Sequence, residues 1–150
     1  MNETDAKYFT EKIPLSETSY IPSFHANDEV NILEGKGKYV LLHGNWLVEE
    51  NQVYLLYFLK NIASSIHAPI KIAGRFIPTN IQQQFAQLQN IQWINNPDEP
   101  TMRALLQQAQ VHFLYTNQAT GLKLKLLNVL HVGRHVVVNS KMLAGTNLQV

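Results

Sequence analysis

The sequence predicts a Rossmann-like, three-layer α/β domain, in which helices cover both faces of a parallel sheet. Two observations support this prediction. From Tyr39 onward, short apolar segments alternate with longer amphipathic ones, as is typical of βαβ units. The apolar segments are continuous rather than alternating, which is expected of strands buried on both faces. A length of 150 residues corresponds to one domain with a sizeable core.

Five strands and four helices are expected after residue 38. The helices are predicted at residues 49–66, 81–89 and 99–109, and between Gly121 and Gly133. The glutamines of the second helix are expected to face solvent, because apolar residues interrupt them at helical spacing. Asn96-Pro97-Asp98 predicts a turn and an N-cap. The predicted strands are residues 39–43, 70–73, 91–94, 111–114 and 135–138.

The first 38 residues do not follow this alternation. A short helix is predicted at residues 5–12 and a short strand at residues 19–21. The sequence EGKGK at residues 34–38 is typical of a flexible, charged linker. The domain is therefore expected to begin near Tyr39.

Composition excludes several classes of function. Twelve basic and 11 acidic residues leave a net charge of +1, which disfavours nucleic acid and anionic membranes as partners. The absence of cysteine excludes disulfides, thiolate catalysis and cysteine-ligated zinc. The six histidines are scattered, so no metal site is expected. The polar N-terminal residues and the lack of an apolar run of about 20 residues predict neither a signal peptide nor a membrane-spanning helix, and the predicted location is cytoplasmic.

Gly121, together with Thr120, is the strongest candidate for an anion site. A glycine at a strand-to-helix turn lets an anion approach the unpaired N–H groups of the helix, where the helix dipole also favours negative charge. Lys123 and Lys125 add positive charge. Because these lysines are two positions apart, only one of them is expected to face the carboxyl edge of the sheet. The alternative is that Gly121 only shapes the turn.

Three stretches in this order resemble the donor-binding half of retaining glycosyltransferases of the GT-B fold. The first is YVLLHGN at residues 39–45, which resembles the first strand and glycine loop of that half. The second is IAGR at residues 72–75, which resembles its second strand. The third is GLKLKLLN at residues 121–128, followed by GRHVV at residues 133–137, which resembles the donor-binding motif and the strand after it.

The resemblance implies a donor substrate and a set of contacts. The donor is a nucleotide-diphosphate sugar, with no cofactor and no metal. Backbone N–H groups of residues 120–122 would meet the β-phosphate, basic side chains would neutralise the diphosphate, and amides would contact sugar and ribose hydroxyls. The residues implied to bind the donor are Gly44, Asn45, Gly74, Arg75, Gln118, Thr120, Gly121, Leu122, Lys123, Lys125 and Asn128.

The chain departs from the family pattern in its acidic residues. The two family glutamates fall on Gln118 and Asn128, and no residue is certain to be catalytic. An amide can bind hydroxyls but cannot stabilise a developing oxocarbenium ion by charge. The loop after the first strand also lacks the arginine and lysine found in many relatives. For Arg75 a solvated charge at a strand end is an alternative, and Trp46 is expected to pack or to lie at a domain interface.

The resemblance also implies how the domains and partners are arranged. Residues 1–38 would be a remnant of the N-terminal, acceptor-binding domain, and residues 39–150 the donor domain, truncated at its C-terminus. The acceptor would be a sugar or lipid-linked molecule held by the missing domain, at the inner membrane surface in a full-length form. This chain alone should show no turnover.

Three other functions are compatible with the sequence. The chain could be a catalytically silent binding module, a sugar-nucleotide epimerase on the related fold, or an interaction module whose residues 1–38 pack on a partner. Self-association through the former domain interface around residues 45–48 is a further prediction.

Overall fold

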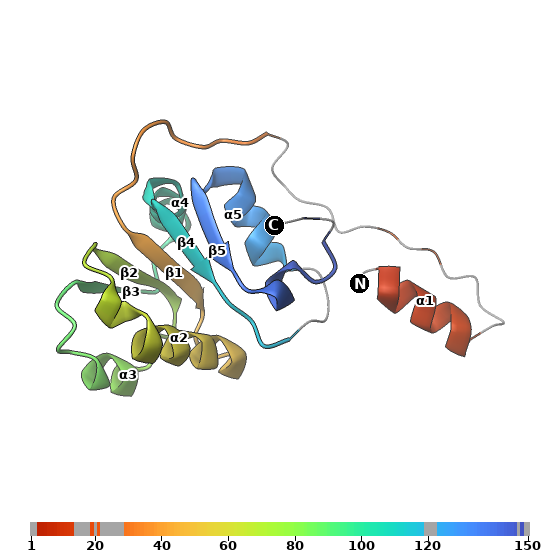
Figure 1. Ribbon diagram of the computed structural model, residues 1–150, viewed down its shortest axis with the longest axis horizontal. Helices are drawn as coiled ribbons and strands as arrows, with labels where there is room; N and C mark the ends of the chain where they lie inside the picture. Colours follow the sequence, from red (N-terminus) through yellow and green to blue (C-terminus); the bar gives the residue numbers. More distant parts are fainter. Residues whose placement is uncertain are drawn as a thin grey trace.

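The computed structural model describes residues 3–13, 19, 21, 29–118, 123–146 and 148. Its centre is an open, all-parallel sheet of five strands in the order β3-β2-β1-β4-β5 (Figure 1). This confirms the predicted α/β, Rossmann-like class. The strands are β1 (Val40–Asn45), β2 (Ile70–Arg75), β3 (Ile91–Asn95), β4 (Val111–Leu114) and β5 (His135–Val138).

Helices cover both faces of this sheet and give the predicted three layers. One face packs against α2 (Glu49–Asn61) and α3 (Thr79–Gln84). The other face packs against α4 (Glu99–Gln108) and α5 (Leu124–Val132). Two short 3-10 helices, η1 (Ala63–Ser65) and η2 (Ser140–Leu143), complete the domain. Helix α1 (Glu3–Lys12) lies apart from the sheet (Figure 1).

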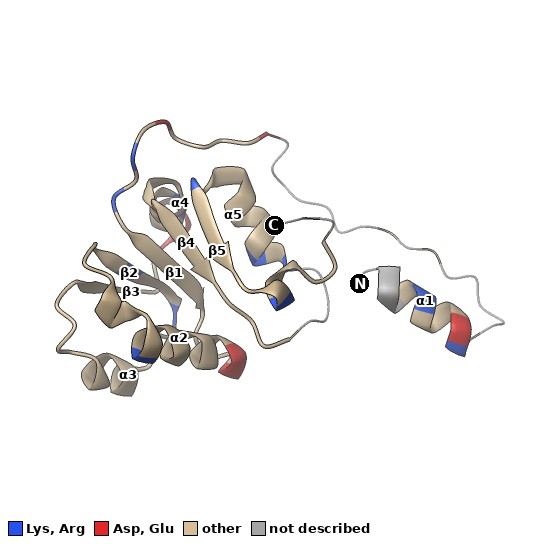
Figure 2. Cartoon of the chain, in the orientation of Figure 1, with Lys and Arg blue, Asp and Glu red and all other residues tan. Residues whose placement is uncertain are grey.

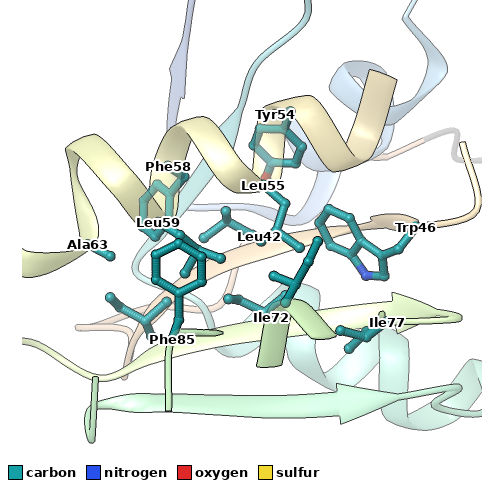
Figure 3. Packing of buried hydrophobic residues seen from close by; sticks show 12 residues of the cluster. Leu42, Trp46, Tyr54, Leu55, Phe58, Leu59, Ala63, Ile72, Ile77 and Phe85 are labelled. Carbon is teal, nitrogen blue, oxygen red and sulfur yellow. The ribbon is translucent and has the colours of Figure 1, made fainter. Parts of the chain in front are cut away.

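The largest core cluster lies between α2, α3 and the sheet. Figure 3 shows Leu42 and Ile72 of the central strands beneath Tyr54, Leu55 and Phe58 of α2. All five side chains are at most 1% exposed. Burial of one such aliphatic or aromatic side chain contributes about 1.5–3 kcal/mol, so this layer holds α2 over β1 and β2.

Strands β1 and β2 each extend two residues beyond the predicted ends, and β3 extends one residue. Gly44 and Asn45 are the last residues of β1, and Gly74 and Arg75 are the last residues of β2. They remain in the ladder, with Gly44 opposite Gly74 and Asn45 opposite Arg75. The prediction that the glycine of the first motif lies in a loop after the strand was therefore wrong. The two backbones approach closely here because Gly74 has no side chain, so that nothing separates its Cα from Gly44 O.

Helices α2 and α4 begin at the predicted residues, but α2 and α3 end early. Helix α2 ends at Asn61, and residues 63–65 form η1 instead of continuing to residue 66. Helix α3 covers residues 79–84 instead of 81–89, because Phe85 leaves the helical conformation and is buried against the core. Helix α4 begins at the predicted cap, where Thr101 N donates to Asp98 Oδ1 at 2.9 Å. Hydrogen bonding by the Thr101 side chain, and then by its backbone N–H, lowers the pKa of the Asp98 carboxyl.

The N-terminal region is only partly as predicted. The helix expected at residues 5–12 is present as α1, whereas Ser19 and Ile21 are in no strand and Tyr20 lies outside the described residues. Residues 34–38 are anchored to the domain, which was not expected of a linker. Lys38 N donates to Gln108 O at 2.9 Å, and Arg134 Nε donates to Gly35 O at 2.9 Å.

Trp46 is a core residue, as the packing alternative predicted. It is fully buried, stacks on Tyr54 with ring centroids 5.8 Å apart, and its Nε1 donates to Ala73 O at 3.2 Å.

Among the described residues, no helix has both the length and the apolar character needed to cross a membrane.

Gly74 should be the most sensitive glycine of the sheet. Its φ is +138°, and a Cβ there would lie 1.8 Å from Gly44 O. We expect Gly74→Ala to lower the free energy of unfolding by more than about 3 kcal/mol, because backbone atoms must move apart. Urea denaturation measures this change. Gly35→Ala is the matched control: its φ is +77° but a Cβ would meet nothing within 4 Å, so only about 1–2 kcal/mol should be lost. Equal losses would contradict the close-approach explanation.

Candidate functional site

The candidate site lies at the carboxyl edge of the sheet, between β1 and β4. The chain runs from β1 outward to β2 and β3, and then returns to place β4 on the other side of β1. Open α/β sheets bind ligands at such a reversal, outside the carboxyl ends of the strands. The two strands are paired only at Val40–Val111 and Leu41–His112, whereas β1 stays paired with β2 up to Asn45. The carboxyl ends of β1 and β4 are therefore not joined by the ladder.

The Lys125 side chain reaches from α5 to this gap. Its Nζ donates to Asn51 Oδ1 at 3.2 Å and lies 5.7 Å from the centre of the Tyr54 ring, both on α2. A Cβ on Gly44 would lie 3.3 Å from the same Nζ. The ammonium group is thus placed against the end of β1, with the absence of a side chain at Gly44 making room for it.

Thr116, directly beyond β4, joins the elements that surround this lysine. Its hydroxyl donates to a Glu50 carboxylate oxygen in the first turn of α2 and accepts from Gln118 N at 3.1 Å. Its carbonyl accepts from Asn139 Nδ2 at 2.7 Å, and its N–H donates to Asn139 Oδ1 at 3.3 Å. A buried threonine therefore fixes the loop after β4 to both α2 and the segment after β5.

Burial sets the charge state of Lys125. Desolvation lowers the pKa of its ammonium group to about 8, and the Glu50 carboxylate opposes this shift. At pH 7 the side chain is mostly charged, because its pKa is still about one unit above that pH. The site therefore offers a positive charge that is poorly hydrated and, among the described residues, donates one hydrogen bond, to Asn51 Oδ1.

Two hollows lie near this edge of the sheet. The larger has a volume of about 550 Å³ and lies between the ends of β1 and β2 and the start of α4. The smaller, of about 460 Å³, lies between the start of α2 and the loop after β4. The larger hollow is lined by His43, Gly44, Asn45, Gly74, Arg75, Pro97, Glu99 and Met102, and the smaller by Val48, Glu49, Glu50, Val53, Asn117 and Gln118.

The structure brings many of the predicted site residues to this edge. Four of them, at the ends of β1 and β2, line the larger hollow, and Gln118 lines the smaller one. Lys125 is the lysine that faces the sheet edge, while Lys123 directly precedes α5. Asn128 lies one turn further along α5 and is exposed. Thr120, Gly121 and Leu122 lie outside the described residues.

The sequence analysis missed the residues that hold Lys125. Glu50 and Asn51 are in the first turn of the helix that follows β1, and Thr116 follows β4. Their positions after strands of a parallel sheet were the available signal, because such positions meet at one edge. The contact between Asn51 and Lys125 could not be predicted from the sequence, because the two residues are 74 positions apart.

Two histidines are buried beside the site. His43 and His112 have ring centroids 6.2 Å apart, and the Nδ1 atom of each is buried without a hydrogen-bond partner among the described residues. His112 Nε2 lies 3.0 Å from Leu106 O. Burial lowers the pKa of His43 to about 3, with smaller contributions from Lys125 and His112, and lowers that of His112 to about 4. Both rings are therefore neutral at pH 7.

In the described part of the chain, no three histidine, aspartate or glutamate side chains are grouped to hold a metal ion.

The order of strands, the gap beside β1 and the placement of Lys125 are the features to compare with known proteins. No protein family model, curated protein or solved structure matches this chain. The likeness to GT-B glycosyltransferases therefore remains a prediction from the sequence motifs.

The two buried histidines should make folding sensitive to acid. Their pKa values in the fold, about 3 and about 4, are below the ordinary value of 6.5, so the unfolded chain binds protons more readily. Their contribution to stability is complete above pH 6.5 and is lost as the pH falls toward 4. Urea denaturation between pH 7 and pH 4 should show this decline, and a His43→Asn/His112→Asn double variant should weaken it. The exposed His67→Asn control should leave the decline unchanged; a decline that persists in the double variant would contradict this assignment.

Proposed function

We propose that this domain binds the diphosphate of a nucleotide sugar at the carboxyl edge of its sheet, as the donor half of a glycosyltransferase. The placement of the Lys125 ammonium group supports this proposal most directly. It lies at the chain reversal between β1 and β4, against Gly44 and bonded to Asn51. A partly desolvated ammonium group favours an anion more strongly than one in water, because the surrounding dielectric screens it less.

A second positive charge borders the same strand. Arg75 ends β2 opposite Asn45 of β1, and its side chain is exposed. None of the described residues forms an ion pair or hydrogen bond with its guanidinium group. Lysine and arginine on opposite sides of the β1 end suit a diphosphate, which carries charge on two phosphorus centres.

The smaller hollow suits the hydroxyl groups of the sugar. It combines the Gln118 side chain with the carboxylates of Glu49 and Glu50. Carboxylates and amides accept hydrogen bonds from hydroxyl groups. We propose that Glu49 and Glu50 supply, from α2, the acidic character that residues 118 and 128 lack relative to the family. Transfer would still need an acceptor held by a second domain, since the reactants must be brought together in a closed cleft.

A silent binding module is the second candidate. It is favoured by the two amides at Gln118 and Asn128, which supply no charge to a transition state. The two candidates share the diphosphate site and differ in whether a full-length form turns over. Measurable transfer by this 150-residue chain alone would contradict both.

Removing the Lys125 charge should abolish most of the affinity for nucleoside diphosphates. We expect UDP, GDP, UDP-glucose or GDP-mannose to raise the melting temperature of the native chain by mass action. Lys125→Met should weaken binding at least about tenfold, which is the effect of losing one charge-assisted contact. Calorimetric titration of both proteins measures the difference.

Two control variants accompany this titration. Lys38→Met removes a charge at the opposite edge of the sheet and should bind as the native chain does. Gly121→Val tests the strand-to-helix turn expected from the sequence and should also lose binding. Unchanged affinity in Lys125→Met, or no thermal shift with any of the four ligands, would exclude the proposed site.

Binding should also weaken as Lys125 loses its proton. Since the pKa of Lys125 is about 8, the affinity for UDP should be nearly constant around pH 7 and then fall. Between the pKa of free Lys125 and its higher pKa in the complex, the fall should approach tenfold for each pH unit, because one proton must be regained on binding. Calorimetry between pH 7 and pH 9.5 measures this dependence. Lys125→Arg keeps the charge over this range and should remove the dependence; a native profile that stays flat to pH 9.5 would argue against Lys125 as the binding cation.

A further inference from the structure

The outer face of α2 carries a stripe with opposite charges at its two ends. Glu49, Val53, Tyr57 and Lys60 follow one another at spacings of four, four and three residues, so they lie on one side of the helix. All four are exposed. Figure 2 shows acidic residues at the start of α2 and a basic residue at its end. The stripe is therefore acidic, then apolar, then basic.

The apolar middle of this stripe continues onto the sheet. Tyr57 stacks on Tyr115, with ring centroids 4.7 Å apart, and Tyr115 follows β4 directly. On the same face of the sheet, Val137 of β5 is paired with Phe113 of β4. Val53, Tyr57 and Val137 are 43%, 41% and 48% exposed. Among the described residues, an apolar surface thus extends uncovered from α2 to the edge strand.

A stripe of this kind is complementary to itself when a second copy is turned by 180°. Glu49 and Lys60 are 11 positions apart, which corresponds to about 16 Å along a helix. A two-fold axis near residue 55, midway along the stripe, would place each Glu49 opposite the other copy's Lys60. The same axis would place each Val53 opposite the other copy's Tyr57. An isologous contact needs one surface to be self-complementary in this way.

We propose that two copies of this chain form a two-fold dimer through the α2 stripe, with the two α2 helices antiparallel. The occupant of the uncovered surface is therefore a second α2 stripe. The apolar middle supplies the burial, and the two Glu49–Lys60 pairs set the orientation, because like charges would meet if the helices were parallel. This contact differs from self-association around residues 45–48. It involves neither Lys125 nor Arg75, but it shares Glu49 and Val53 with the smaller hollow, so dimer formation would compete with sugar binding there.

Reversing one charge at a time tests both the contact and its orientation. Glu49→Lys gives a stripe with two basic ends, and Lys60→Glu gives a stripe with two acidic ends. Each variant alone should dimerise at least about tenfold more weakly than the native chain, since like charges face each other twice. An equimolar mixture of the two should form a heterodimer, because every charged pair is then opposite in sign. Sedimentation equilibrium and native mass spectrometry measure these masses against the 17.1 kDa of one chain.

Matched controls separate this contact from general charge effects. Glu99→Lys and Arg103→Glu change exposed charges on α4 and should dimerise as the native chain does, alone and mixed. Leu47→Asp alters the exposed residue before α2 and should also leave dimerisation unchanged. A native chain that stays monomeric up to about 1 mM, the range of weak contacts, would overturn the proposal. So would a dimer that only Leu47→Asp disrupts, or a mixture without heterodimer.

Discussion

The pairing of β1 with two different partners is the constraint on which the rest of the structure depends. β1 is bound along its whole length to β2, but to β4 only through Val40 and Leu41. Its side chains Leu41 and Leu42 are fully buried, one on each face, so the strand cannot shift without losing both core layers. The unpaired end of β1 beside β4 is consequently a fixed gap in an otherwise rigid sheet. The Lys125 ammonium group lies at this gap, against Gly44 and Asn51.

A buried ammonium group is costly unless its environment compensates it. Three neighbours compensate the Lys125 charge: the side-chain oxygen of Asn51, which accepts a hydrogen bond from Nζ, the Tyr54 ring, and the Glu50 carboxylate, which also accepts from Thr116. The lowered pKa of Lys125 shows that this compensation is incomplete. A bound phosphate would complete it. Desolvation of the Lys125 ammonium group destabilises the free domain, and the same desolvation strengthens its attraction for an anion. The local energetics are in this way linked to the proposed function.

The sequence predicted the fold well where one physical effect dominates. Strands such as Val111–Leu114 and His135–Val138 were placed at their observed bounds, because apolar runs between turn residues are an unambiguous signal. Errors arose where tertiary contacts override local pattern. The β1 strand continues through Gly44, which reads as a loop residue, because Gly74 opposite it allows the backbones to approach. Helix α3 ends early because burial of the Phe85 side chain in the core stabilises the fold more than one further helical turn would.

The candidate site was predicted only in part, for a related reason. Residues at strand ends, such as Asn45 and Arg75, could be assigned to one edge from the parallel topology alone. The choice of Lys125 over Lys123 as the lysine facing the edge, and its contact with Asn51, depend on how α5 lies over the sheet. No local spacing encodes that arrangement. The α2 stripe, in contrast, can be identified in the sequence once the bounds of the helix and its buried face are known.

The most direct test of this account is to map UDP binding residue by residue, with ¹⁵N-labelled protein titrated by NMR. The account predicts that amide shifts change at Gly44, Asn45 and Gln118, and that these changes saturate together. Residues around the hollow of about 330 Å³ at the opposite edge, Ser64, His67 and Asn90, should not change. Changes confined to that opposite edge, or no saturable change at the carboxyl edge at millimolar UDP, would contradict the claim that the gap beside β1 is a diphosphate site.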